Sequence, residues 1–142
     1  MQASAFDRLG LESRFTESFY TRSGANVLRG MHLQLAPADG AKLICCLEGA
    51  ILDLALDLRP ESPAFGTVCT FELSADQPTA AYIPRGVAHG FYVRDAPALT
   101  LYQVSSEYDP GCDTGVRWDS FGFEWPVSDP LLSPRDAGLR SF

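Results

Sequence analysis

Basic residues are scarce in this chain of 142 residues. Its 11 lysines and arginines face 18 aspartates and glutamates, which gives a net charge of −7, and Lys42 is the only lysine. Proteins that bind nucleic acids need clustered basic residues to displace counterions from phosphates. The composition therefore argues against a nucleic-acid partner. It leaves room for a small anionic ligand, because a few basic residues can converge in one pocket.

Long apolar runs are also missing. The longest are far shorter than the roughly 20 residues that span a bilayer, and the N-terminus lacks the basic start and apolar core of a signal peptide. We therefore expect a cytoplasmic protein with no membrane partner. Hydrophobic residues make up 46% of the chain and charged residues 20%, as in folded proteins. The length predicts a single domain over residues 1–142.

The four cysteines form no CxxC pair. Cys45 and Cys46 are adjacent, so in a strand they would point to opposite faces, which disfavours a shared metal ion. Without a sign of secretion, we expect free, buried thiols rather than disulfides or a metal site.

The middle of the chain is typical of β-strands separated by turns. Residues 42–59 contain two apolar stretches around Glu48-Gly49, which predicts a hairpin. In the second stretch leucines alternate with Asp53 and Asp57, the period of a half-buried strand. Further strands are expected at residues 67–73, 80–84, 90–94 and 99–105, and a short helix at residues 4–11. From Tyr108 onward we expect ordered loops packed on the barrel. The pattern predicts an all-β sandwich or barrel.

The two histidines lie in distinctive surroundings. The stretch Pro84-Arg85-Gly86-Val87-Ala88-His89 is similar to the second motif of cupin barrels, and residues 30–34 (GMHLQ) stand where cupins have their first motif. In metal-binding cupins three histidines and a glutamate enclose the ion, whereas Gln34 here replaces one histidine. Glutamine is a poor ligand for Zn, Fe or Mn. We therefore expect no metal and no other cofactor, and a metal-dependent cupin is disfavoured.

His32 has three possible roles: metal ligand, general base or packed core residue. Arg29 lies three positions before it and Lys42 ten after it, so a barrel interior could bring the three together. Burying cations without a partner is costly. The cluster therefore favours an anionic ligand, with His32 as the chemical group.

Six segments in order extend this likeness: VLRGMHLQ, KLICCLEGAILDLALDLRPESPAFG, YIPRGVAHGFYV, LYQVSSEYDP, GVRWDSFGFEWP and LSPRD. From about Phe15 to Asp136 the chain resembles the dTDP-4-dehydrorhamnose 3,5-epimerase family. The resemblance implies a cupin-type jelly roll, a homodimer and catalysis without a metal. It also implies a nucleotide-linked 4-keto-6-deoxy sugar as substrate, on the route to rhamnose and related deoxysugars.

The resemblance also implies a role for each matched residue. His32 matches the base that removes a proton next to the ketone, and Asp136 matches the carboxylate that pairs with it. Tyr102 matches the acid on the other face of the sugar, since a phenol keeps its proton at neutral pH. Lys42 would stabilise the enolate oxygen. The residues expected to bind the substrate are Arg29, Gln34, His89 and, near the nucleotide base, Tyr108.

Three departures from the family pattern concern the periphery of this site. An early strand with a DxRG element, whose arginine reaches substrate phosphate, is absent before Phe15. Phe19 stands where an asparagine is usual, and Asp113 where a glutamate is common. The chemistry is thus expected to carry over better than the substrate identity. The nucleotide base and the inverted carbon, C3 or C5 or both, stay open. A catalytically weak cupin that binds a sugar nucleotide is the alternative.

Overall fold

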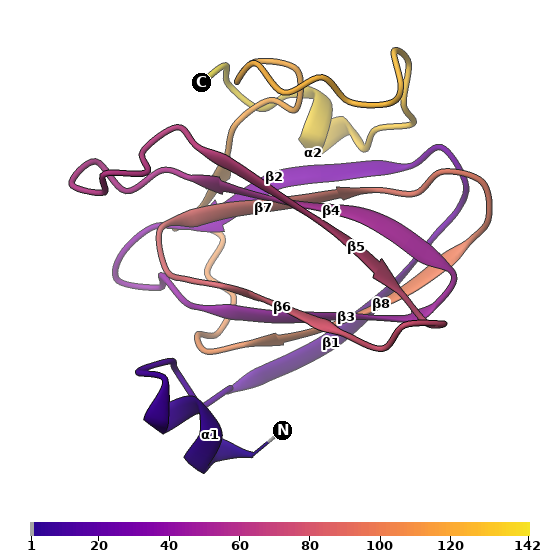
Figure 1. Ribbon diagram of the computed structural model, residues 1–142. Coiled ribbons are helices and arrows are strands. Elements are labelled where there is room, and N and C mark those ends of the chain that lie inside the picture. The colour runs from indigo at the N-terminus through magenta and orange to yellow at the C-terminus, as the bar shows by residue number, and fades with distance from the viewer. Residues whose placement is uncertain (1) are drawn as a thin grey trace.

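The computed structural model describes residues 2–142 as two antiparallel β-sheets that face each other (Figure 1). The first sheet has the strand order β1-β8-β3-β6 and consists of β1 (Glu17–Ser23), β3 (Lys42–Glu48), β6 (Ala80–Ile83) and β8 (Ala98–Val104). The second has the order β5-β4-β7-β2-β9 and consists of β2 (Leu28–Gln34), β4 (Ala50–Asp57), β5 (Val68–Ser74), β7 (Val87–Tyr92) and β9 (Asp113–Gly115). The prediction of an all-β, cupin-type jelly roll is confirmed.

Two short helices flank the sheets on opposite sides. Helix α1 (Ala3–Arg8) overlaps the segment predicted to be helical, residues 4–11, and lies below the four-stranded sheet in Figure 1. Helix α2 (Pro134–Ala137) belongs to the C-terminal segment, which covers the outer side of the five-stranded sheet. Within residues 2–142, neither helix nor any other is long and apolar enough to cross a membrane.

The predicted hairpin at Glu48-Gly49 is wrong. Strand β3 pairs with β6 and β8, whereas β4 pairs with β5 and β7, so the chain passes from one sheet to the other at this point. Gly49 has φ of 71°, and a Cβ there would lie 2.6 Å from the carbonyl oxygen of Pro97. The glycine therefore marks a crossing between sheets, which a sequence cannot distinguish from a tight hairpin turn.

Strand β4 is buried on both faces, not on one as predicted. Leu54 and Leu56 pack under the C-terminal segment together with Trp125. The alternate residues point between the two sheets, where Asp53 is fully buried. The C-terminal segment thus forms a third layer, and a carboxylate that the alternating pattern placed at a polar surface lies inside the molecule.

The strands β1, β2 and β9 were not among the strands predicted from the sequence. Strand β1 is an edge strand whose side chains are mostly exposed, so it lacks a clear apolar alternation. Strand β9 has three residues and interrupts a region that is otherwise loop, as expected from Tyr108 onward. The thiols are free as predicted, but Cys46 is buried whereas Cys69 is exposed.

The strands β2 and β7 approach each other closely at Gly30 and Gly90. A Cβ at Gly30 would lie 2.5 Å from the Cα of Gly90 and 3.0 Å from the carbonyl oxygen of His89. The pairing register of β2 with β7 shifts between Arg29 and His32. Because of this shift, two residues three positions apart both face the interior between the sheets, where strict alternation would separate them.

This approach makes Gly30 sensitive to substitution. In the Gly30→Ala variant the new methyl group would meet backbone atoms, and φ of 126° is unfavourable for any residue with a Cβ. We expect a loss of about 3 kcal/mol in the free energy of unfolding, measured by urea denaturation. Gly24→Ala is the control, because a Cβ there meets nothing within 4 Å. Equal stability of the two variants would contradict the packing argument.

Candidate active site

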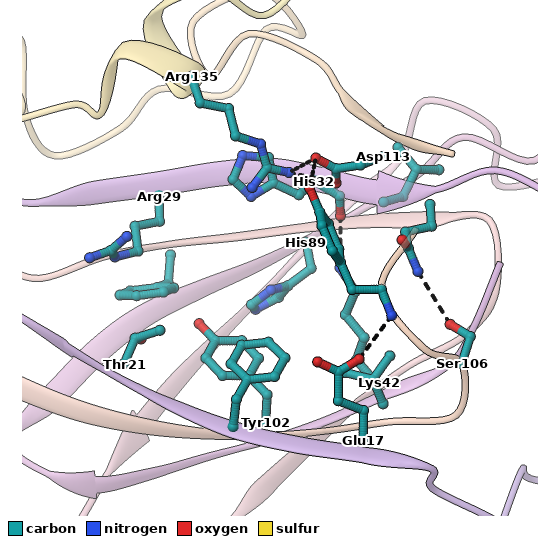
Figure 2. A pocket seen from close by; sticks show the side chains of 16 residues that line it. Glu17, Thr21, Arg29, His32, Lys42, His89, Tyr102, Ser106, Asp113 and Arg135 are labelled. Carbon is teal, nitrogen blue, oxygen red and sulfur yellow. Dashed lines mark hydrogen bonds and ion pairs between the residues drawn. The ribbon is translucent and has the colours of Figure 1, made fainter. Parts of the chain in front are cut away.

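A cavity of about 340 Å³ lies between the two sheets (Figure 2). Seven of the eight predicted site residues line it, namely Arg29, His32, Gln34, Lys42, His89, Tyr102 and Tyr108. The eighth, Asp136, contacts His32 from α2. Residues spread over more than 100 positions of sequence thus meet in one place.

The partly exposed His32 pairs with the buried Asp136 at one wall of the cavity. The Nε2 atom of His32 lies 2.5 Å from Oδ1 of Asp136, and Ser133 Oγ donates to Oδ2 of the same carboxylate at 2.7 Å. Burial by itself raises the pKa of Asp136, but the hydrogen bonds from His32 and Ser133 outweigh it and hold the pKa below its usual value. Asp136 is therefore ionised at neutral pH and fixes the orientation of the imidazole.

Burial also lowers the pKa of His32 below 6.5, and the opposing effect of Asp136 only partly offsets it. At pH 7 the imidazole is therefore neutral. Since Nε2 faces Asp136, Nδ1 is the nitrogen left to accept a proton. This is the protonation state and the geometry of a general base.

Lys42 reaches from the four-stranded sheet to the opposite one. Its Nζ donates a hydrogen bond to the main-chain carbonyl of His32 at 2.9 Å. Burial lowers its pKa to about 8. Among the nearby charges, the carboxylate of Asp113 raises this pKa and the guanidinium of Arg135 lowers it. The ammonium group is thus charged at pH 7 and held next to the base.

Tyr102 lies on the wall opposite His32, because it comes from β8 of the four-stranded sheet (Figure 2). Its ring stacks on Phe19 and makes a T-shaped contact with His89, with the ring centroids of His89 and Tyr102 6.0 Å apart. Burial, and then the nearby carboxylate of Asp53, raise the pKa of Tyr102 well above its ordinary value. The phenol therefore keeps its proton throughout the neutral range.

His89 pairs with a carboxylate that the sequence analysis did not select. Its Nε2 contacts Oδ1 of Asp53, which is completely buried on β4. His89 and His32 are register partners on β7 and β2, so two His–Asp pairs lie side by side on one sheet. The sequence signal for Asp53 was its place in the alternating stretch, but that pattern predicted a polar surface.

Two more of the predicted residues, Arg29 and Gln34, lie in the cavity walls and bond to neighbouring residues. Arg29 Nε donates to Ser23 Oγ at 2.9 Å, which holds its guanidinium in place at one end of the cavity. The Gln34 amide donates to the carbonyls of Ala38 and Glu107 and accepts from the main-chain N–H of Asp109. Gln34 thus links the loop after β2 to the loop after β8.

The mouth of the cavity is bordered by Tyr108, Glu17, Asp113 and Arg135. The main-chain N–H of Tyr108 donates to Glu17 Oε2 at 2.9 Å, and its phenol contacts Asp113 at 3.5 Å. Arg135 forms an ion pair with Asp113, with its Nη2 2.5 Å from Oδ2. Glu17 and Arg135 were not selected from the sequence, although Arg135 lies in the matched segment LSPRD, next to Asp136.

The donors around the cavity do not assemble as a metal site in the part of the chain that the structure describes. Among residues 2–142, no group of three or more His, Cys, Asp and Glu side chains is placed to hold an ion. Each histidine instead faces its own aspartate.

Comparison with known proteins matches the whole chain. The family model described as dTDP-4-dehydrorhamnose 3,5-epimerase aligns with residues 1–142. The enzyme of that name from Escherichia coli (strain K12) is 39% identical over 140 residues, which cover 96% of this chain and 76% of the relative.

Solved structures agree with this match. The dTDP-4-dehydrorhamnose 3,5-epimerase from Bacillus anthracis str. Ames, with TDP and PPi bound, superposes with a TM-score of 0.96 at 33% identity, covering 100% of this chain and 83% of the other. The Legionella pneumophila Philadelphia 1 epimerase, in complex with dTDP-4-keto-L-rhamnose, gives 0.93 at 34% identity and covers 99% of this chain and 77% of the other. The fold, the ordered segments and these matches show that the chain belongs to the dTDP-4-dehydrorhamnose 3,5-epimerase family.

Proposed function

We propose that the protein is an epimerase of a nucleotide-linked 4-keto-6-deoxy sugar, acting at C3, C5 or both in dTDP-rhamnose-type deoxysugar biosynthesis. The observation that carries this proposal is the placement of a neutral, carboxylate-paired His32 and a protonated Tyr102 on opposite walls of one cavity. Inversion next to a ketone needs a base on one face of the carbon and an acid on the other.

In the first step Nδ1 of His32 takes the proton from the carbon next to the ketone. The C–H electron pair moves into the new carbon–carbon double bond, and the ketone oxygen becomes an enolate. Asp136 stabilises the imidazolium that forms, and Lys42 stabilises the negative charge on the oxygen. In the second step the phenol of Tyr102 gives its proton to the same carbon from the opposite face. Solvent later removes the proton from His32 and returns one to Tyr102.

The charges of the cavity fit a sugar attached to a diphosphate. Arg29, Lys42 and Arg135 line the cavity in a protein whose overall charge is negative. Guanidinium groups bind phosphate oxygens through two parallel hydrogen bonds. The ligands in the Bacillus and Legionella relatives, a nucleoside diphosphate and a dTDP-linked keto sugar, support the same substrate class. The homodimer and the cytoplasmic location stay predictions, and light scattering of the purified protein tests the first.

Removing one proton-transfer group at a time tests the division of labour. His32→Ala should lose both deuterium uptake from D₂O and inversion, by about 10²–10⁴-fold in rate. Tyr102→Phe should keep uptake at the carbon that faces His32 but lose inversion there. NMR of dTDP-4-keto-6-deoxyglucose after incubation measures both.

The matched control is Tyr20→Phe, because Tyr20 lies on β1 with 72% of its surface exposed and outside the cavity. It should behave like the unmodified protein. Near-normal turnover by His32→Ala would rule out His32 as the base, and no exchange by the unmodified protein would favour a cupin that only binds the sugar nucleotide.

The pH dependence of kcat/KM should follow the two shifted pKa values of the free enzyme. His32 must be neutral, so activity falls only at a pH below 6.5 because its pKa is lowered. Lys42 must be charged, so activity declines above its pKa of about 8. Tyr102 has a raised pKa and does not contribute near this range.

Replacing Lys42 by arginine separates these contributions. The Lys42→Arg variant should be slower, but its decline near pH 8 should disappear, because a guanidinium stays protonated to beyond pH 12. Steady-state rates from pH 5 to 10 measure this, with the pH stability of each protein checked by circular dichroism. A decline near pH 8 that persists in Lys42→Arg would assign it to another group.

A further inference from the structure

Phe19 lies directly on the tyrosine to which the acid role is given. Phe19 and Tyr102 are register partners in the pairing of β1 with β8, and both face the cavity. Their rings are stacked, with the centroids 4.8 Å apart and the planes 12° from parallel. Such offset stacking is an attractive geometry for two aromatic rings.

The two rings differ in exposure. Phe19 is 42% exposed, whereas Tyr102 is 7% exposed although it lines the cavity. His89 also contacts the Tyr102 ring, in a T-shaped arrangement. Tyr102 is therefore enclosed, and the more exposed ring of Phe19 covers one face of its ring. The side chain at position 19 thus lies between the solvent and one face of the Tyr102 ring.

We propose that Phe19 is a positioning residue for the acid: its ring fixes the orientation of Tyr102 and shields the phenol from water. The inference rests on the proposed function: Phe19 would influence whether the proton that is returned inverts the carbon. Once His32 holds the carbon proton, the enolate has two outcomes. His32 returns a proton to the same face, which gives exchange without inversion, or Tyr102 delivers its proton to the opposite face, which gives inversion. Phe19 increases the second outcome by keeping the phenol aimed at the carbon.

Substitutions at position 19 distinguish the effect of ring stacking from the effect of covering Tyr102 with any apolar side chain. Phe19→Tyr retains the stacked ring, Phe19→Leu keeps an apolar cover without stacking, and Phe19→Ala removes both. Because Phe19 is half-exposed on an edge strand, these variants should fold. The matched control is Phe71→Ala, since Phe71 is 36% exposed on β5, the edge strand of the other sheet, and lies outside the cavity.

The first measurement is the ratio of deuterium exchange to inversion on dTDP-4-keto-6-deoxyglucose in D₂O. Misplacing a reacting group by about 1 Å can cost about 10²-fold in rate. We therefore expect Phe19→Ala to raise this ratio by at least about tenfold, with exchange itself changed little, and Phe19→Leu to lie between. Phe19→Tyr and Phe71→Ala should match the unmodified protein. An unchanged ratio in Phe19→Ala, or an equal change in Phe71→Ala, would overturn the proposal.

The second measurement needs no substrate and so distinguishes failure of this inference from failure of the proposed function. The protein is labelled with 3-fluorotyrosine, and the ¹⁹F resonance of Tyr102 is assigned by its loss in Tyr102→Phe. A fixed ring gives a sharp signal, which should broaden or shift in Phe19→Ala and stay the same in Phe19→Tyr and Phe71→Ala. A Tyr102 signal unaffected by Phe19→Ala would refute the positioning role even if the protein is an active epimerase. If the unmodified protein neither exchanges nor inverts, the proposed function fails, and the ¹⁹F signal still decides whether Phe19 holds Tyr102.

Discussion

The near-contact between the backbones of β2 and β7 determines which side chains reach the cavity. At Gly30 and Gly90 the two strands lie too close for a Cβ, and the register shifts between Arg29 and His32. Without the shift, strict alternation would turn one of these two residues away from the interior. The same approach aligns His32 with His89 as register partners. A constraint of backbone packing thus places both a phosphate-binding candidate and the candidate base.

Burial has the same physical effect on three groups of the site but different chemical consequences. It opposes charge, so it lowers the pKa of His32 and Lys42 and raises that of Tyr102. For the histidine this favours the proton acceptor, and for the tyrosine the proton donor. For the lysine it works against the charged form that an enolate needs, and the carboxylate of Asp113 partly restores it. One low-dielectric cavity therefore favours the protonation states that the proposed base and the proposed acid need at neutral pH.

The sequence was sufficient for the fold class and for most of the candidate site, because ordered motifs mark His32, Tyr102 and Lys42 directly. It was misleading where a local pattern has two structural meanings. The alternation around Asp53 is the same for a strand with one solvated face and for a strand covered by a third layer. Glycine at position 49 suits a hairpin as well as a crossing between sheets. Only long-range packing distinguishes these cases, and periodicity does not report it.

The C-terminal segment connects stability to the chemistry of the site. Its Trp125 packs with Leu54 and Leu56 on the outer face of the five-stranded sheet. A few residues later the same segment forms α2, where Ser133 caps the helix and donates to Asp136, which in turn holds His32. The carboxylate that orients the candidate base is therefore supplied from outside the sheet by the layer that covers its leucines. Packing of the segment on that apolar face therefore also holds Asp136 next to the imidazole, so the third layer contributes to the candidate active site as well as to the core.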